Sequence, residues 1–162
     1  MSKKFWVPKP AYLQMCELGQ QSFPLETGGI LLGYVADNND VVVTAIIGPG
    51  PNAIHRRYRF SPDADYQQVK LSAHHLLTNG QETYLGDWHT HPRGSTALSL
   101  VDKRTLARIA GTSSSGITEP IMAILGGGSE IWEVNAVRLI GWKRRFPFNR
   151  YDLAALMLQL YG

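Results

Sequence analysis

The chain has 162 residues, of which 44% are hydrophobic and 18% charged, a composition that predicts one globular domain and excludes a disordered or fibrous protein. Its 16 basic and 13 acidic residues give a net charge of +3, which permits an acidic partner without requiring nucleic acid. The single cysteine excludes an internal disulfide framework and a cysteine-based zinc cage. No apolar run approaches the roughly 18 residues of a membrane span. The N-terminus lacks the apolar stretch of a signal peptide. We therefore expect a cytoplasmic protein with no membrane partner.

The first half of the chain predicts a helix, a strand hairpin and a second helix. Pro10 can begin a helix, and AYLQMCELGQQ continues it with apolar residues at helical spacing. Residues 28–35 and 41–47 are typical of buried strands, and the DNND turn between them predicts a hairpin. The Ser-Pro pair at 61–62 predicts a capped helix that runs to about Leu77.

The second half predicts a strand with histidines at its end, a third helix and further strands. Residues 83–91, TYLGDWHTH, are typical of a strand, and a helix is expected from Ser99 to about Ala110. A strand meander is expected from residue 121 onward, and LAALMLQL predicts an amphipathic C-terminal helix at about 151–161. Helices and strands interleave without regular alternation. We therefore expect a single α/β or α+β domain over residues 1–162, with helices packed on a mixed β-sheet.

The two histidines at the end of the third predicted strand indicate a metal site. Residues two apart on a strand face the same side, so His89 and His91 can bind one ion. Asp102, in the first turn of the next helix, can supply a third ligand. Two imidazoles and a carboxylate suit one Zn²⁺ per chain, and three protein ligands leave a position for the water of a catalytic site. The alternative for Ser99 and Asp102 is a helix capping box, which does not exclude the metal role.

Further residues can serve this site. Glu26 precedes a buried strand, where it can act as the base for an attacking water; the alternative is a turn acid before a Gly-Gly bulge. Gly28 and Gly29 allow close approach of backbone or substrate. Asp87 shares the histidine face of its strand and can orient an imidazole.

Basic residues form two runs, at 55–59 and 143–145. Most charge runs are solvated faces. The alternative is a surface for an acidic partner or for the chain end of a substrate protein, with Arg56, Arg57 and Arg59 as the candidate contacts.

Several motifs together resemble the JAMM (JAB/MPN) zinc metalloprotease family. The pattern consists of ETGGILLG at 26–33, GDWHTHP at 86–92 and the Ser99-x-x-Asp102 spacing, while GPGPNA at 48–53 and FSPD at 60–63 resemble the prokaryotic JAB branch. The resemblance covers about residues 5–145, with one departure at Leu98, where a proline often precedes the serine. It implies the JAB/MPN fold.

The resemblance also implies a role for each chemical residue. His89, His91 and Asp102 would hold zinc, and Glu26 would act as general base and then as general acid. Ser99 would donate a hydrogen bond to the oxyanion of the tetrahedral state. All five positions are intact in this sequence.

The implied reaction is hydrolysis of the peptide or isopeptide bond after the flexible C-terminal tail of a ubiquitin-like protein, in deconjugation or precursor processing. Prokaryotic JAB proteins of this size resemble the deconjugases of bacterial conjugation operons, including those of CBASS anti-phage defence. One alternative is a peptidase that releases cysteine or a small adduct from a sulfur-carrier protein. Another is a JAB module that binds partners without catalysis, against which the intact Glu26 and Ser99 count. A role in binding DNA has only the basic pI of about 9.1 in its favour.

Overall fold

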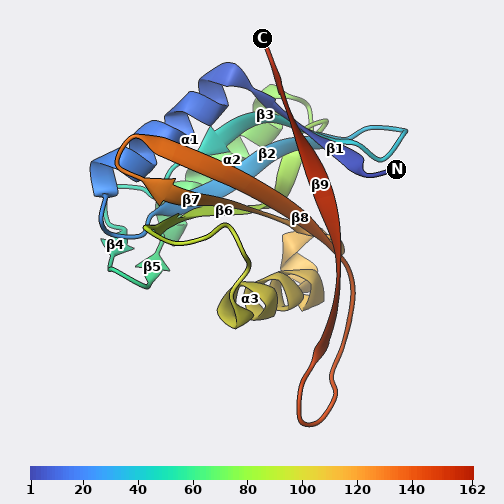
Figure 1. The fold of residues 1–162 in the computed structure, drawn as a ribbon. Helices are drawn as coiled ribbons and strands as arrows, with labels where there is room; N and C mark the ends of the chain where they lie inside the picture. The colour runs from blue at the N-terminus through green and yellow to red at the C-terminus, as the bar shows by residue number, and fades with distance from the viewer.

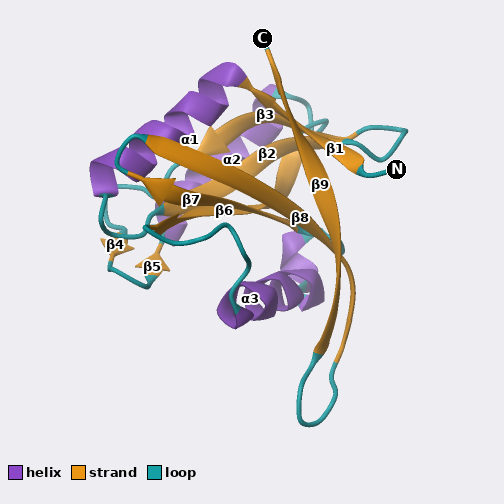
Figure 2. Ribbon diagram, viewed as in Figure 1, coloured by secondary structure: helices purple, strands orange, loops and turns teal.

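The structure, a computed structural model, describes residues 1–162 apart from the side chain of Ser113. Helices pack around a closed β-barrel (Figures 1 and 2). The helices are α1 (Lys9–Ser22), α2 (Ala64–Leu77), α3 (Leu100–Gly111) and the 3₁₀ helix η1 (Ser113–Ser115). The strands are β1 (Lys3–Pro8), β2 (Gly28–Val35), β3 (Val41–Ile47), β4 (Ile54–His55), β5 (Phe60–Ser61), β6 (Thr83–Pro92), β7 (Ile121–Gly128), β8 (Ile131–Lys143) and β9 (Arg150–Tyr161).

The barrel has the strand order β1-β3-β2-β6-β7-β8-β9, and β4 and β5 form a separate two-stranded sheet. β2 pairs antiparallel with both β3 and β6, and β8 pairs antiparallel with β7 and β9. β6 runs parallel to β7, and β1 closes the barrel by running parallel to β3 and β9. The expected mixed sheet in an α+β domain is therefore confirmed, as is the β2–β3 hairpin.

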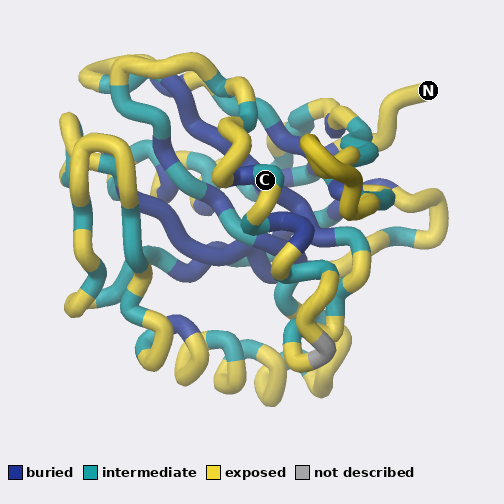
Figure 3. Tube along the Cα trace, turned by 90° about the horizontal axis from the view of Figure 1, so that it is seen from below, coloured by how far each residue is buried: buried dark blue, intermediate teal, exposed yellow. Residues whose placement is uncertain are grey.

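The main core lies between the barrel strands and α1. Strands in the middle of the order are buried on both faces, which Figure 3 shows as dark segments across the centre of the molecule. Trp88 is fully buried and donates from Nε1 to the carbonyl of Ile47, and Met15 of α1 is fully buried in the same cluster. α3 has its own cluster: Leu106 packs against Met122 and Leu139 of the neighbouring strands. No helix in the described part of the chain is both long and apolar enough to cross a membrane.

The predicted C-terminal helix at about 151–161 is wrong, because this segment is strand β9. Leucine, alanine, methionine and glutamine all have good helix propensity, which favours a helix where only local sequence is considered. Pairing with β8 on one side and β1 on the other overrides that propensity.

One element was missed by the sequence analysis, and one predicted helix cap needs correction. The N-terminal residues form β1, which the sequence analysis did not predict. The cap of α2 is Asp63, whose Oδ1 accepts a hydrogen bond from the backbone N–H of Tyr66, rather than Ser61.

Candidate metal centre and catalytic cleft

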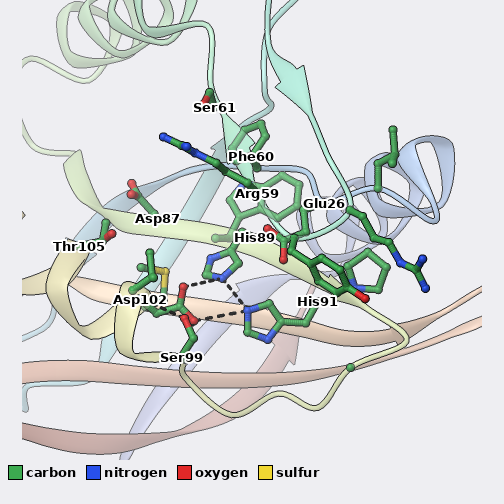
Figure 4. Close-up of a pocket in the computed structure, with 18 of the residues that line it drawn as sticks. Glu26, Arg59, Phe60, Ser61, Asp87, His89, His91, Ser99, Asp102 and Thr105 are labelled. Carbon is green, nitrogen blue, oxygen red and sulfur yellow. Dashed lines mark hydrogen bonds and ion pairs between the residues drawn. The ribbon is translucent and has the colours of Figure 1, made fainter.

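His89 and His91 lie at the C-terminal end of β6 and converge as the strand alternation predicted. Thr90, between them, points to the other face and is fully buried. β6 lies in the middle of the sheet, with Gly28 of β2 opposite His89 and Gly126 of β7 opposite His91. The two Nε2 atoms are 3.0 Å apart (Figure 4).

Asp102 reaches the histidines from the first turn of α3. Its Oδ1 lies 3.1 Å from Nε2 of His89, and its Oδ2 lies 3.4 Å from Nε2 of His91. A complete capping box sets this orientation: Ser99 N donates to Asp102 Oδ2 at 2.8 Å, and Asp102 N donates to Ser99 Oγ at 3.1 Å. The capping and metal interpretations of Ser99 and Asp102 are thus compatible in one geometry.

These three side chains fit a metal ion. Each offers one ligand atom, and the ligand atoms all lie within 4.8 Å of one another. Nδ1 of His91 lies 3.0 Å from the carbonyl oxygen of Ser95, which can only accept a hydrogen bond. In its neutral form, His91 therefore carries its proton on Nδ1, which leaves the Nε2 lone pair free to bind a metal, as in many metal-binding histidines. In the imidazolium form, Nε2 is protonated as well and donates to Asp102.

The electrostatics of the cluster favour charged, mutually stabilising groups. Burial acts to raise the pKa of Asp102, but hydrogen bonds from His89 and His91 outweigh it and hold the pKa well below its usual range. The hydrogen bond to Asp102 raises the pKa of His91, against the opposing effect of burial.

Glu26 lies beside the two imidazoles, in the loop between α1 and β2 (Figure 4). Burial raises the pKa of Glu26, and the nearby His89 and His91 partly offset the rise. A carboxyl whose pKa lies above its ordinary value is better matched to proton transfer near neutral pH than an exposed one.

A cleft of about 1110 Å³ opens over the cluster. The residues predicted for the site that line it are Glu26, Gly29, Arg57, Arg59, Asp87, His89, His91, Ser99 and Asp102.

Arg56 and Gly28 are not among the residues that line the cleft. The side chain of Arg56 is exposed. Gly28 is buried against β6, the strand that carries the histidines: a Cβ on it would clash with the carbonyl oxygen of Trp88. Gly29 has a similar constraint, because its Cβ would lie 1.9 Å from the carbonyl oxygen of Ile47. Strand packing thus accounts for both glycines.

Asp87 does not orient an imidazole through any hydrogen bond that the structure shows among the described residues. Its Oδ1 instead accepts from the hydroxyl of Tyr84 at 2.8 Å. The pKa of Asp87 lies above its ordinary value, mainly because the carboxyl is buried.

Two residues that the sequence analysis did not identify, Thr27 and Thr90, join two segments of the site by hydrogen bonds. Thr27 N donates to Oγ1 of Thr90 at 3.0 Å, and Thr90 N donates to the carbonyl of Thr27 at 2.9 Å, which joins the chain after Glu26 to the residue between the histidines. The two threonines lie 63 positions apart, and no local pattern pairs them.

Two imidazoles and a carboxylate in a cleft, with a further carboxyl beside them, are typical of metal-dependent hydrolases. Residues 8–140 match the family model of prokaryotic homologues of the JAB domain. The chain belongs to this family.

Comparison with known proteins gives relatives over different lengths. The chain is 33% identical over 162 residues to the probable metalloprotease y4qB of Sinorhizobium fredii, and the match covers 99% of each protein. It is 30% identical over 107 residues to a CD-NTase/cGAS isopeptidase of Escherichia coli, covering 66% of this chain and 65% of that one. A protein of the same name from Enterobacter hormaechei is 34% identical over 107 residues, covering 63% of this chain and 56% of that one.

A solved structure shows the same fold. The solution structure of a protein from Desulfitobacterium hafniense aligns with a TM-score of 0.62 at 17% sequence identity. The alignment covers 97% of this chain and 92% of that one, so the likeness extends over the whole barrel.

Proposed function

We propose that this protein is a zinc-dependent peptidase or isopeptidase that hydrolyses the bond after the C-terminal tail of a ubiquitin-like protein. The observation that carries the proposal is the convergence of His89, His91 and Asp102 in one cleft, with Glu26 beside them. Membership of the JAB family and the relatives named metalloprotease and isopeptidase support it.

His89, His91 and Asp102 would hold the metal. Nitrogen and carboxylate ligands with one open position are the ligand set of a catalytic zinc site. Bound Zn²⁺ supplies a Lewis acid for the scissile carbonyl and lowers the pKa of water to about 7.

Glu26 and Ser99 perform the remaining steps. The oxygen of a water molecule attacks the carbonyl carbon while the carboxylate of Glu26 accepts its proton. Glu26 then delivers that proton to the amide nitrogen as the carbon–nitrogen bond breaks, which leaves a carboxylic acid and an amine; the acid releases its remaining proton to solvent and becomes a carboxylate. Ser99 Oγ already accepts the N–H of Asp102, so its own O–H is available to donate to the oxyanion.

The substrate is proposed to be a conjugate or precursor of a ubiquitin-like protein, in a pathway of bacterial antiviral defence. A cleft of about 1110 Å³ has room for an extended tail with small residues at the cleaved bond. Arg57 and Arg59 on its wall offer positive charge to an acidic protein surface beyond the tail. The cytoplasmic location stays a prediction from the sequence.

Two measurements test this function. Protein purified without a metal-binding tag should contain about one zinc per chain by elemental analysis. It should also cleave fusions in which a ubiquitin-like domain encoded beside its gene is joined to a reporter through a lysine isopeptide or a peptide bond. Full activity of metal-free protein would contradict the zinc role. Cleavage of small adducts of a sulfur carrier, with folded conjugates left intact, would replace the substrate.

The arginines provide a further test with an internal control. Changing Arg57 and Arg59 to glutamate should raise KM more than it lowers kcat, because a surface contact is present both before and during the transition state. Arg56→Glu is the matched control, since its exposed side chain lies outside the cleft. An equal effect of all three changes would argue against a specific contact.

A further inference from the structure

The backbone of Glu26 is held by hydrogen bonds to residues outside its own loop. Glu26 lies in the loop between α1 and β2, so neither element includes its peptide groups. On the C-terminal side, the Thr27–Thr90 pair ties the next residue to β6. The hydrogen bonds of Glu26 itself lead to His55 at the end of β4 and to Arg56 just after it.

Both peptide groups of Glu26 bond to neighbouring residues of β4 and its loop. Its N–H donates to the carbonyl of Arg56 at 2.8 Å. Its carbonyl oxygen lies 3.0 Å from Nδ1 of His55. A carbonyl only accepts, so Nδ1 of His55 is the donor, and both the neutral Nδ1–H tautomer and the imidazolium provide that proton.

His55 is itself held in the small sheet. Its ring lies against Phe60 of β5, with centroids 5.6 Å apart and planes at 31°. Arg56 N donates to Arg59 O at 2.9 Å, which closes the hairpin between β4 and β5. Arg57, Arg59 and Phe60 of the same hairpin line the cleft. The β4–β5 hairpin therefore both lines the cleft and binds the backbone of Glu26 through hydrogen bonds.

We propose that His55 is a positioning residue that fixes Glu26 in the cleft by donating a hydrogen bond from Nδ1 to the Glu26 carbonyl. The inference rests on the proposed function, in which Glu26 transfers the proton. Loss of the bond leaves one of the two anchors of Glu26, and a displacement of about 1 Å can cost a reaction up to about 10²-fold in rate. We expect a loss of about tenfold in kcat, because the Arg56 anchor and the Thr27–Thr90 pair remain.

Two substitutions separate the hydrogen bond from ring packing. His55→Phe keeps an aromatic ring against Phe60 but has no donor. His55→Asn loses the ring and keeps an N–H donor at the δ position. If the hydrogen bond positions Glu26, His55→Phe should lower kcat about tenfold, with KM, zinc content and melting temperature unchanged. His55→Asn should stay within about twofold of the wild type. His75→Phe, an exposed histidine on α2, is the matched control.

Amide hydrogen exchange of the Glu26 N–H provides a readout that needs no substrate. Protection should fall in His55→Phe, because the bond to Arg56 loses its neighbouring anchor, and should persist in His55→Asn. Absence of cleavage by the wild type would refute the proposed function. Amide exchange of the Glu26 N–H would still decide whether His55 positions Glu26. Unchanged kcat and protection in His55→Phe, or an equal loss in both variants, would overturn the inference.

Discussion

At the scale of single residues, the carboxylate of Asp102 serves two structures at once. Oδ1 is nearest to His89, while Oδ2 is shared between His91 and the backbone N–H of Ser99. The start of α3 and the orientation of a candidate metal ligand are thus set by the same few atoms. A change to the cap therefore acts on the candidate metal site as well as on the helix.

Ser99→Ala should affect stability and rate by separable amounts. Loss of the cap should lower the free energy of unfolding by about 1 kcal/mol, because the N–H of Asp102 loses its acceptor. Loss of the oxyanion donor should lower the single-turnover rate by roughly 10²-fold. Chemical denaturation measures the first effect, single-turnover kinetics measures the second, and zinc content shows whether the metal is retained. Ser99→Thr, which keeps a hydroxyl, is the control; a less stable variant with normal turnover would leave only the capping role.

Glu26→Gln should separate proton transfer from metal binding. Glutamine keeps the size of the side chain and removes the base, so turnover should fall by roughly 10² to 10⁴-fold while the zinc content stays at the wild-type level. Asp102→Ala should lose the metal as well as the activity. The measurements are steady-state kinetics and elemental analysis of the same preparations. Wild-type turnover in Glu26→Gln would show that another group is the base.

At the scale of secondary-structure elements, Asp40 joins β1 to the turn that precedes β3. Its carboxylate accepts from Lys4 N at 2.9 Å and from Nε1 of Trp6 at 3.1 Å, both in β1, and from Asn38 in the turn before β3 at 3.2 Å. The backbone hydrogen bond from Lys4 is the largest cause that lowers the pKa of Asp40, followed by the bond from Trp6. The ionised form therefore stabilises the contact between β1 and β3.

Asp40→Asn should reduce the acid sensitivity of the fold. The pKa of Asp40 is lower in the folded chain than the value of about 3.9 in an unfolded one. Its stabilising contribution is present above pH about 3.9 and is lost as the pH falls through the folded pKa. The wild type should be more stable than Asp40→Asn at pH 7, and the difference should shrink below pH 4. Denaturation at both pH values measures it; Asp37→Asn, in the same turn and exposed, should show no such convergence.

Local patterns predicted the elements that carry the site but not the contacts that hold it. Strand alternation placed His89 and His91 on one face, and the Ser99–Asp102 spacing predicted the start of α3, because both depend on neighbours within a few residues. Glu26 was identified from its place before β2. The bond between His55 and Glu26 and the Thr27–Thr90 pair arise from tertiary packing across 29 and 63 positions, and no spacing rule predicts them.

At the scale of the whole molecule, the C-terminal segment completes the barrel. β9 pairs with β8 through a hairpin and with β1 from the opposite end of the sequence. The hydroxyl of Tyr161 at its end donates to the carbonyl of Val43 in β3 at 2.8 Å. A segment with helical propensity becomes a strand because only the assembled sheet supplies both partners. β9 therefore joins the two ends of the chain in one core.

Substitutions at two adjacent positions of β9 should differ sharply in their effect on stability. Leu156 is 8% exposed, lies opposite Lys3 and Ala136, and belongs to the main core with Phe5. Met157, the next residue, is 53% exposed, since strand neighbours point to opposite faces. Leu156→Ala should lower the free energy of unfolding by about 2–5 kcal/mol, and Met157→Ala by under about 0.5 kcal/mol.

Urea denaturation, followed by both tryptophan fluorescence and circular dichroism, measures both changes. The two probes should report one coincident transition in each variant if β9 and the rest of the barrel unfold together. A loss of stability in Met157→Ala as large as that in Leu156→Ala would contradict the strand alternation of β9. A separate early transition in Leu156→Ala would show instead that β9 opens independently, leaving β1 and β8 as edges of a barrel that remains folded.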